Sequence, residues 1–304
     1  MSEKTTMRAI EYSTFGGPDV LRLEEVDLPE PGPGQVRVAV HAAGVNTLDW
    51  KIREGQLGEQ PMPQRPGLEL AGVVDATGSG CRATIGEQIF GWSLTGAYAD
   101  YALADIVASK PRALPWHEAA SLPVAGEAAV RALRELEIRP GETLLIHGAS
   151  GTVGTIATQL AIAAGAIVIG TADDANTDYL SGLGAIPVKY GGGLTGRVRE
   201  ITTRIDAVLD AAGFGALPDL LALRGSTERI LTLADSAASR KGVRFSSRTP
   251  SVNDAESLTE LATKVTTGQL RLRRGHIYSL PQAADAQQDS ATSHTRGKIT
   301  LKIS

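Results

Sequence analysis

A glycine-rich turn in the middle of the chain has the spacing of a dinucleotide-binding site. Gly148, Gly151 and Gly154 follow one another at intervals of three residues. They come directly after a short apolar run, residues 143–147, and before apolar side chains that recur at helical intervals. A glycine turn at a helix N-terminus presents backbone N–H groups at the positive end of the helix dipole. The turn therefore predicts a binding site for a pyrophosphate.

The elements expected around this turn support the same interpretation. Their order is strand, turn, helix and strand, with Gly165 ending the helix and residues 166–171 forming the second strand. In the usual G-x-G-x-x-G register the three positions are Ala149, Gly151 and Gly154. The alternative is a glycine- and alanine-rich turn that only packs a helix on a sheet. Two buried strands within a unit of about 30 residues favour the dinucleotide site.

The composition excludes several classes of protein. The chain has 304 residues, of which 42% are hydrophobic and 21% charged, and its net charge is −4. We therefore expect neither nucleic acid nor an anionic membrane as a partner. No stretch of about 18 apolar residues and no secretory signal is found, so we expect a cytoplasmic protein without a membrane span. The single cysteine, Cys81, excludes an intramolecular disulfide and a multi-cysteine zinc site.

The sequence pattern changes near Trp116. Before this residue, many short segments of strand character are separated by glycine and proline, which is typical of a compact β-rich domain. After an alanine-rich helical segment at 118–136, strands alternate with helices, which predicts an α/β domain with a parallel sheet. A helix at 257–267 and strand character at 271–280 and 297–303 follow. The strands expected in the parallel sheet are 143–149, 166–171, 186–190, 207–211, 229–233 and 242–246.

Several segments in a fixed order connect this chain to a known family. They are HAAGVNTLDWKIREG (41–55), PGLELAGVV (66–74), GAYADYALA (96–104), AASLPVAGEAA (119–129), LLIHGASGTVG (144–154), GTADDANTDYLSGLGA (170–185), VLDAAG (208–213) and HTRGKITLKI (294–303). Through them the chain resembles the zinc-independent quinone oxidoreductase, or zeta-crystallin-like, branch of the medium-chain dehydrogenase/reductase superfamily.

The resemblance implies a fold and a reaction. It implies a GroES-like, β-rich catalytic domain built from residues 1–118 and 269–304. A doubly wound Rossmann domain, residues 119–268, is implied between them, with the active site in the cleft. Members of this family transfer a hydride from NADPH to a quinone or to a carbon–carbon double bond conjugated to a carbonyl group.

The zinc ligands of the related zinc-dependent branches are missing. Those branches have a cysteine at the position of Asn46 and a histidine at the position of Leu68. Their four-cysteine lobe is also missing, and the histidines show no spacing typical of a zinc site. We therefore expect no metal, so that the protein must polarise its acceptor by hydrogen bonds.

Asn46, Asp49 and Lys51 are the candidate catalytic residues, and the resemblance places them in a substrate loop. It places Asn46 beside the nicotinamide and the substrate, where its amide would donate to a developing enolate oxygen. Lys51 stands where many members have tyrosine, and would stabilise an enolate or supply a proton if its pKa is lowered. The alternative is that Lys51 is a solvated surface cation and that Asp49 caps or pairs locally.

Three further residues are candidates for the substrate pocket. Glu127 stands where the family has leucine, and Ala128 replaces a threonine that approaches the nicotinamide. Glu127 is either an acid or base near the substrate or, as we favour, faces water or pairs with Arg131 four residues later. Trp50 and Trp92 are candidates for lining an aromatic acceptor pocket. The alternative is that they only pack in the core, because aromatic residues at strand ends pack against other side chains more often than they contact ligands.

The identity of the cofactor depends on the end of the second strand. An NAD site has a carboxylate there, which binds the ribose 2′-hydroxyl. The corresponding residue is Ala172, which permits the 2′-phosphate of NADPH. Asp173 and Asp174 follow, and no Lys or Arg lies between Asp173 and Ile186, which favours NADH. The family favours NADPH, and Tyr190 matches its tyrosine near the adenosine ribose. We predict NADPH, with NADH as the alternative.

The predicted cofactor contacts lie in the glycine turn and after the ends of four strands. Small residues suit these positions, although they would also suit any turn from strand to helix. The residues are Ala149, Ser150, Gly151, Thr152, Val153, Gly154, Thr171, Asp173, Tyr190, Ala212, Gly213, Leu233 and Ala234.

The last strand expected in the parallel sheet bears on the oligomeric state. Residues 241–248 are expected to form an edge strand that pairs across a twofold axis, which predicts a homodimer. A monomer whose edge is guarded by Lys241 and Arg248 is the alternative.

The predicted activity is reduction of a quinone or an enone by NAD(P)H, and a narrower version is a tailoring enoyl reductase in a biosynthetic pathway. The alternative from another class is a non-redox NAD(P)H-binding sensor.

Overall fold

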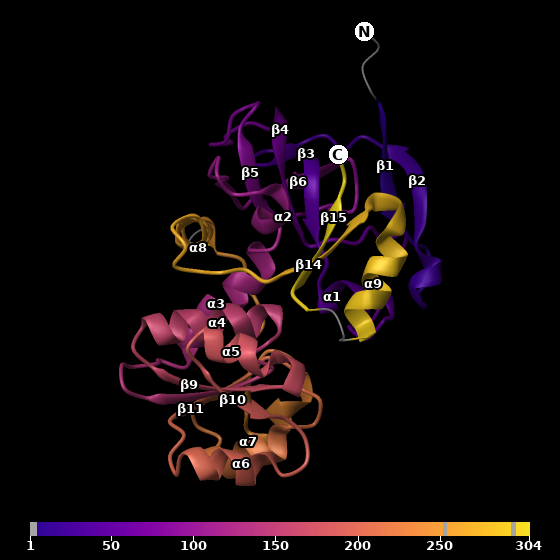
Figure 1. The fold of residues 1–304 in the computed structure, drawn as a ribbon. Coiled ribbons are helices and arrows are strands. Elements are labelled where there is room, and N and C mark those ends of the chain that lie inside the picture. The colour runs from indigo at the N-terminus through magenta and orange to yellow at the C-terminus, as the bar shows by residue number, and fades with distance from the viewer. Residues whose placement is uncertain (1–4, 252–253, 293–295) are drawn as a thin grey trace. The chain divides into compact units, whose positions relative to one another are not determined.

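The chain divides into two compact units. The computed structural model describes residues 5–251, 254–292 and 296–304, so the first two residues of the matching segment 294–303 lie outside the described residues. Figure 1 shows the indigo start and the yellow end of the described chain within the same unit. Unit 1 comprises Met1–Val124, Ser251–Gln269 and Arg274–Ser304, and unit 2 comprises Ala125–Pro250 and Leu270–Arg273.

Unit 1 is built on a mostly antiparallel sheet. The strand order is β14-β15-β3-β4-β5-β7, with β6 also paired to β3, and β14–β15 is its parallel ladder. Burial alternates along the first part of β3, as expected for a strand with one face on the core. The strands are β3 (Val36–Gly44), β4 (Glu69–Thr77), β5 (Gln88–Trp92), β6 (Tyr101–Ala104), β7 (Val107–Ser109), β14 (Arg274–Ser279) and β15 (Lys298–Lys302), and a separate antiparallel ribbon pairs β1 (Thr6–Glu11) with β2 (Arg22–Asp27).

Helices from both parts of the chain cover unit 1. Helix α9 packs against α1 and β15, and α8 packs against β7. Leu258, Leu261 and Ala262 of α8 are buried. For this reason residues 251–269 belong to unit 1, whereas the bounds expected from the sequence assign most of them to the nucleotide domain. The helices are α1 (Thr47–Arg53), α2 (Trp116–Ala119), α8 (Asp254–Thr266) and α9 (Ala283–Thr292), with short 3-10 turns at Pro18–Val20 and Leu280–Gln282.

Unit 2 contains the predicted parallel sheet. In the described residues its six strands run in the order β10-β9-β8-β11-β12-β13, and every ladder is parallel. The chain adds strands on one side of β8 and then on the other, so the topological switch point lies between β8 and β11. The strands are β8 (Thr143–His147), β9 (Ile167–Ala172), β10 (Ile186–Lys189), β11 (Ala207–Asp210), β12 (Ile230–Thr232) and β13 (Arg244–Phe245).

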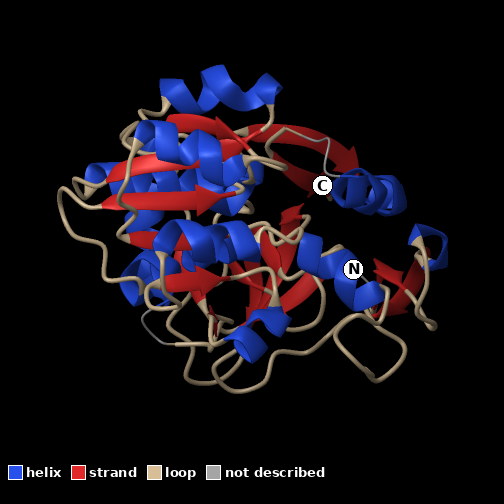
Figure 2. Cartoon of the chain, turned by 90° about the horizontal axis from the view of Figure 1, so that it is seen from below, coloured by secondary structure: helices blue, strands red, loops and turns tan. Residues whose placement is uncertain are grey.

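Helices cover both faces of this sheet, as a doubly wound fold requires. Figure 1 shows α3, α4 and α5 on one face and α6 and α7 on the other, and Figure 2 shows the same layers with strands in red. The helices are α3 (Pro123–Glu135), α4 (Thr152–Ala163), α5 (Thr177–Gly182), α6 (Leu194–Ile201) and α7 (Leu217–Arg224), with 3-10 turns at Asp174–Asn176 and Ser236–Lys241.

The α/β class and the Rossmann-type sheet are confirmed, but some element bounds are wrong. The helix expected at 118–136 is divided into α2 and α3, because Pro123 lacks the N–H that would continue the first helix. The strand expected at 242–246 is reduced to Arg244–Phe245. Among the described residues, no helix is long and apolar enough to cross a membrane.

Candidate active site

Asn46, Glu69 and Lys298 form a buried polar cluster in unit 1. Asn46 precedes α1, Glu69 begins β4 and Lys298 begins β15. Asn46 Nδ2 donates to Glu69 Oε1 at 2.9 Å, and Lys298 Nζ lies 2.6 Å from the same oxygen. Lys298 Nζ also donates to Asn46 Oδ1. The exposed fraction of each residue is 8% or less, so these contacts replace the hydrogen bonds that water would make.

The partners of Asn46 determine how its amide is oriented. An ammonium group only donates hydrogen bonds, and a carboxylate only accepts them. The amide oxygen must therefore face Lys298, and the amide nitrogen must face Glu69. One N–H of the Nδ2 group donates to Glu69, and the second has no acceptor among the described residues, which leaves it available to another acceptor. The donor role of Asn46 toward a substrate stays a prediction.

Glu69 reaches this position because the neighbouring residue of β3 is glycine. A Cβ atom at Gly44 would lie 2.2 Å from Glu69 Oε1 and 2.5 Å from the carbonyl oxygen of Ala120. The second carboxylate oxygen of Glu69 accepts the N–H of Val124 at 2.8 Å. Glu69 and Lys298 are not among the predicted site residues. The available signal was a charged residue at the first position of each of two strands, followed in both by mainly apolar residues.

A zinc ion does not fit this cluster. Zinc sites are built from thiolate, imidazole and carboxylate ligands around the ion. Here the Lys298 ammonium lies against Glu69 and Asn46, where a second cation would be repelled. Among the described residues, no group of three or more His, Cys, Asp or Glu side chains could hold a metal ion. The charge of Glu69 is balanced by Lys298 and by hydrogen bonds.

Asp49 lies in a helix, whereas a loop was expected. Residues Thr47–Arg53 form α1, because Asn46 and Asp49 occupy the capping positions of a helix N-terminus. Asp49 Oδ2 accepts the N–H of Asn46 at 2.7 Å and the hydroxyl of Tyr98 at 3.1 Å. Asp49 therefore forms the local cap, and its catalytic role stays a prediction. It also holds Asn46 at the end of the helix.

Burial raises the pKa of Asp49 to about 6, although the Asn46 N–H and the Lys298 charge act in the opposite direction. The unfolded chain loses this proton near pH 4, whereas the folded protein keeps it until about pH 6. The stability contributed by the protonated group is therefore fully present below about pH 4 and is lost as the pH rises through 6. This loss predicts a pH-dependent effect of the neutral variant Asp49→Asn.

Between about pH 4 and 7, we expect the free energy of unfolding of the wild type to fall by roughly 3 kcal/mol relative to Asp49→Asn. Urea unfolding at each pH measures this difference. Asp178→Asn is the control, because Asp178 is exposed on α5. A difference between wild type and Asp49→Asn that does not change with pH would contradict the raised pKa.

Lys51, Trp50 and Trp92 occupy different environments in unit 1. Lys51 is partly exposed on α1, with its Nζ 5.8 Å from the centre of the Trp50 ring. Trp50 is partly buried. Trp92 is buried and pairs directly with Glu69 across the β4–β5 ladder. The register therefore places Trp92 next to the polar cluster. Substrate contacts of all three residues stay predictions.

Glu127 belongs to unit 2 and is paired within its own helix. Its Oε1 accepts from Arg131 Nε at 2.7 Å, and both side chains are mostly buried. Arg131 also donates to the hydroxyl of Ser246, which in turn donates to Glu135 at 2.8 Å. The pair with Arg131 that the sequence favoured is confirmed. The carboxylate of Glu127 is therefore already engaged by a cation.

The predicted dinucleotide turn lies at the switch point of the parallel sheet in unit 2. Helix α4 begins after Gly151, and no side chain of the described residues caps its N-terminus. The N–H groups of its first turn have no acceptor within the helix. A Cβ atom at Gly154 would lie 2.2 Å from the carbonyl oxygen of Gly148, so only glycine permits this approach of helix and turn. Such a cradle fits the pyrophosphate of a dinucleotide.

Residues predicted from separate strands meet around this turn. Thr171 at the end of β9 accepts the N–H of Gly148 at 3.0 Å through its hydroxyl oxygen. A Cβ atom at Gly148 would lie 2.7 Å from the Cβ of Ala212, and one at Gly213 would lie 3.3 Å from the Cβ of Ala234. The carboxyl ends of β8, β9, β11 and β12 therefore converge, as the parallel order predicts.

Asp210, which the sequence analysis missed, organises the turn after β11. Its Oδ1 accepts the N–H groups of Ala212 at 3.1 Å and Gly213 at 2.7 Å. Its Oδ2 accepts the hydroxyl of Thr232 at 2.9 Å, which connects β11 to β12. Asp210 is 1% exposed, so it acts on the position of the loop and not through solvent.

One of the two acidic residues after β9 has a basic partner, and the other is bonded by a neutral amide. Asp174 pairs with Lys189 at 2.5 Å. Asn176 donates to Asp173 at 2.6 Å and accepts from Arg273 at 2.6 Å through its amide oxygen. The absence of Lys and Arg between Asp173 and Ile186 favoured NADH. Folding brings Lys189 to Asp174 and Arg273 to Asn176, so cations from later positions in the chain also lie at this corner.

Arg273 is a further residue that sequence reasoning missed. It stands 97 positions after Asn176 and enters unit 2 from the segment that follows α8. Its guanidinium carbon lies over the Tyr179 ring on α5, 4.2 Å from the ring centre, which is a cation–π contact. Tyr190, the predicted adenosine contact, is half-exposed after β10.

Family models match both parts of the chain. The model described as "Alcohol dehydrogenase GroES-like domain" matches residues 32–111, and "Zinc-binding dehydrogenase" matches residues 188–301. The quinone oxidoreductase of Sus scrofa is 33% identical over 322 residues, which cover 96% of this chain and 95% of that protein. The quinone oxidoreductase of Mus musculus is 40% identical over 173 residues, so this match spans 55% of the chain and 52%, about half, of that relative.

Solved structures resemble the chain over nearly its whole length. A quinone oxidoreductase from Coxiella burnetii has a TM-score of 0.89 at 30% identity, covering 98% of this chain and 100% of the other. A mycobacterial protein solved with NADPH has a TM-score of 0.86 at 28% identity, covering 97% and 99% of the two chains.

Proposed function

Because the chain belongs to the quinone oxidoreductase branch of the medium-chain dehydrogenase/reductase superfamily, we propose that it is an NAD(P)H-dependent reductase. Its acceptor would be a quinone or an α,β-unsaturated carbonyl compound, reduced without zinc. The turn between β8 and α4 carries the proposal, since it combines an uncapped helix N-terminus with a glycine that allows close approach.

Residues of unit 2 would hold the cofactor. The N–H groups of Thr152, Val153 and Gly154 would bind the pyrophosphate at the positive end of α4. Small residues after β11 and β12, including Gly213 and Ala234, would leave room for the nicotinamide half. When bound, the cofactor supplies a hydride. The other predicted contacts are Ala149, Ser150, Gly151, Thr171, Asp173, Tyr190, Ala212 and Leu233.

Residues of unit 1 would bind and polarise the acceptor. Asn46 is held by Glu69 and Lys298 with one amide N–H left to donate. A hydrogen bond from this N–H to the acceptor oxygen would stabilise the negative charge that develops on it. Since the amide is held by two charged partners, it needs little reorganisation when the acceptor binds. Lys51 remains the proposed proton donor, with water as the alternative.

We propose NADPH, in preference to NADH, as the cofactor. The residue at the ribose position is Ala172, which has no carboxylate. The Arg273 guanidinium donates to Asn176, and Asn176 in turn donates to Asp173. Guanidinium groups bind phosphate through two parallel hydrogen bonds, so Arg273 is suited to a 2′-phosphate. The NADPH complex of the mycobacterial relative supports this choice.

Replacing Arg273 with glutamine tests the choice of cofactor. We expect the Kd for NADPH to rise by about tenfold, the effect of losing a charged hydrogen bond, while the Kd for NADH changes little. Fluorescence titration with both nucleotides measures the two constants. Arg271→Gln is the control, because Arg271 is exposed two positions earlier. Tighter binding of NADH than NADPH by the wild type would contradict the proposal.

Turnover distinguishes the reductase from the non-redox sensor. Stopped-flow mixing of the protein and NADPH with a panel of quinones, enones and an enoyl thioester is expected to show loss of NADPH absorbance with at least one acceptor. Mixtures without acceptor provide the control. Nucleotide binding without oxidation by any acceptor would instead support the sensor. Preference for the enoyl thioester would support the tailoring reductase.

A homodimer through the edge of the parallel sheet is also proposed. β13 forms this edge, and both of its residues, Arg244 and Phe245, are exposed. An exposed edge strand can pair with the same strand of a second copy across a twofold axis. Light scattering is expected to give twice the mass of one chain. The mass of a single chain would show that the edge is guarded in a monomer.

A further inference from the structure

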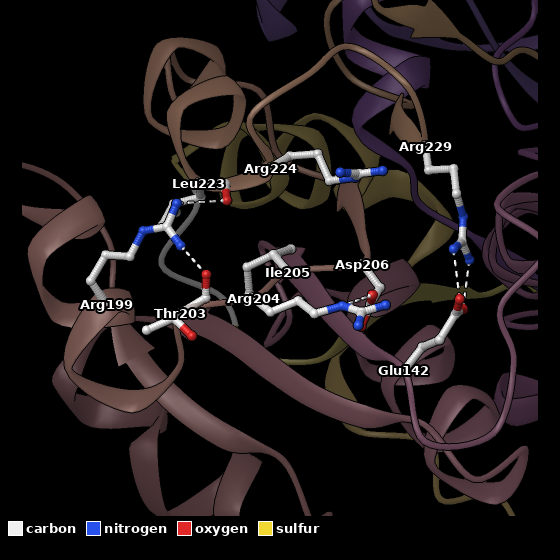
Figure 3. A pocket seen from close by; sticks show the side chains of 9 residues that line it. All are labelled: Glu142, Arg199, Thr203, Arg204, Ile205, Asp206, Leu223, Arg224 and Arg229. Atoms are coloured by element: carbon white, nitrogen blue, oxygen red, sulfur yellow. Dashed lines mark hydrogen bonds and ion pairs between the residues drawn. The ribbon is translucent and has the colours of Figure 1, made fainter.

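A pocket rich in arginine lies in unit 2 at the amino ends of the parallel strands. It is lined by Arg199, Arg204, Arg224 and Arg229, together with Glu142 and Asp206, and its volume is about 350 Å³ (Figure 3). We call it the Arg224 pocket. The protein as a whole carries a net charge of −4. The pocket has four guanidinium groups and two carboxylates, so its net charge is positive although that of the whole chain is negative. Two of the four positive charges are not balanced by a carboxylate of the pocket.

The Arg224 pocket is separate from the predicted cofactor site. Glu142, Asp206 and Arg229 each stand immediately before a strand, namely β8, β11 and β12. The glycine turn and its partners follow the carboxyl ends of the same strands. In a parallel sheet the starts and the ends of the strands lie at opposite edges, and open α/β sheets bind nucleotides at the carboxyl edge. A ligand in the Arg224 pocket would therefore not be the bound dinucleotide.

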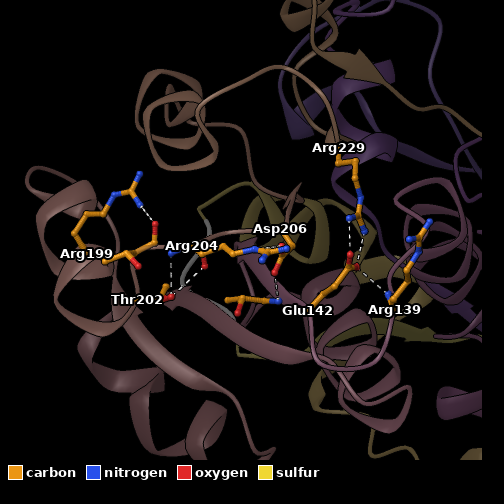
Figure 4. A network of polar contacts seen from close by, with 9 residues as sticks. Arg139, Glu142, Arg199, Thr202, Arg204, Asp206 and Arg229 are labelled. Carbon is orange, nitrogen blue, oxygen red and sulfur yellow. Dashed lines mark hydrogen bonds and ion pairs between the residues drawn. The ribbon is translucent and has the colours of Figure 1, made fainter.

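Both carboxylates of the pocket already accept hydrogen bonds from an arginine and from a backbone N–H (Figure 4). Glu142 accepts from both terminal nitrogens of Arg229, at 2.7 and 2.6 Å, and from the N–H of Arg139 at 2.9 Å. The hydrogen bond from Arg229 lowers the pKa of Glu142 to about 2. Asp206 accepts from Arg204 Nε at 2.6 Å and from the N–H of Thr143 at 2.9 Å.

The arginines of the pocket differ in whether their N–H groups have acceptors. Arg199 donates to the carbonyl oxygens of Thr203, Ala222 and Leu223, which is the usual role of a cation near helix C-termini. Arg224, in the last turn of α7, has no hydrogen-bond or ion-pair partner among the described residues. The Nε atom of Arg224 is nevertheless buried from solvent. Figure 3 shows its guanidinium extended along the pocket with no contact to the other labelled residues.

We propose that the Arg224 pocket binds a phosphate dianion, either free or as the monoester of a small metabolite. The two unbalanced positive charges match the charge of a phosphate group near neutral pH. The fork of donors on Arg224 matches the oxygen atoms of such a group, which accept hydrogen bonds in pairs. The volume also exceeds what one phosphate needs and lies in the range of pockets for small organic ligands.

Isothermal titration of the full chain with inorganic phosphate and with glycerol 3-phosphate tests this site, in chloride buffer of constant ionic strength. We expect saturable binding of at least one of them, weakened about tenfold or more in Arg224→Gln. Arg240→Gln is the matched control, because Arg240 is exposed in the 3-10 turn before β13 and lines no part of the pocket. It is expected to bind like the wild type.

The outcomes decide both the site and the source of the ligand. Binding of glycerol 3-phosphate that is tighter than that of inorganic phosphate supports an ester, and the reverse supports the free anion. No saturable binding of either probe, or equal binding by wild type and Arg224→Gln, would overturn the proposal. Since Arg224 makes no hydrogen bond among the described residues, the variant should melt like the wild type in chloride. Arg224→Lys, which keeps the charge but not the fork, should bind with intermediate affinity.

Discussion

Replacing Lys298 with methionine is expected to lower the free energy of unfolding by about 3–5 kcal/mol. The reason is that Glu69 is 0% exposed and would remain buried without the ammonium that lies 2.6 Å from it. The hydrogen bonds from Asn46 and Val124 would remain but carry no full positive charge. Urea unfolding of the wild type and the variant measures the difference.

Two further variants show whether the loss comes from the unpaired charge. Lys302→Met is the matched control, because Lys302 is exposed near the other end of β15, and we expect a change within about 0.5 kcal/mol. The double variant Glu69→Gln with Lys298→Met removes both charges and should recover part of the lost stability. A loss from Lys298→Met no larger than that from Lys302→Met would contradict the inference that the cluster depends on this pair.

Replacing Gly154 with alanine is expected to weaken cofactor binding by at least about tenfold and to destabilise the fold by about 1–3 kcal/mol. The added Cβ would lie 2.2 Å from the carbonyl oxygen of Gly148 and 2.7 Å from the Cα of Ala149, both backbone atoms. Helix α4 and the turn must therefore separate, which displaces the N–H groups proposed to bind the pyrophosphate. Fluorescence titration with NADPH and urea unfolding measure the two effects.

Gly196→Ala is the matched control for this substitution. Gly196 lies within α6, and a Cβ atom there would have no neighbour within 4 Å. Alanine has the higher helix propensity, so this variant should gain about 0.5–1 kcal/mol and bind NADPH like the wild type. Equal NADPH affinity in Gly154→Ala and Gly196→Ala would show that the turn does not hold the cofactor.

The sequence alone was sufficient for the dinucleotide turn and the parallel sheet. Both depend on local patterns, namely the three-residue glycine spacing and the alternation of apolar strands with helices. The order of the sheet then follows from short right-handed connections, which place the carboxyl ends of successive strands at one edge. The pairing of Glu127 with Arg131 was also accessible, because residues four apart on a helix are neighbours.

Two local signals set element bounds that broader patterns did not predict. Asn46 and Asp49 have the spacing of a helix cap, yet the family comparison favoured a substrate loop. Pro123 likewise divides a segment whose alanine content suggested one continuous helix. In both cases the deciding residues are visible in the sequence. The side chains of Asn46 and Asp49 cap α1, and Pro123 lacks the backbone N–H that would continue α2.

Only the tertiary structure decided which charges meet. Lys298 joins Asn46 across 252 positions, and Arg273 joins Asn176 across 97. No periodicity encodes such separations, because they depend on which strand of the sheet lies next to which. The sequence therefore determined the glycine turn that we propose binds the pyrophosphate. The pairing of Lys189 with Asp174, the cluster of Asn46, Glu69 and Lys298, and the Arg224 pocket emerged only from folding.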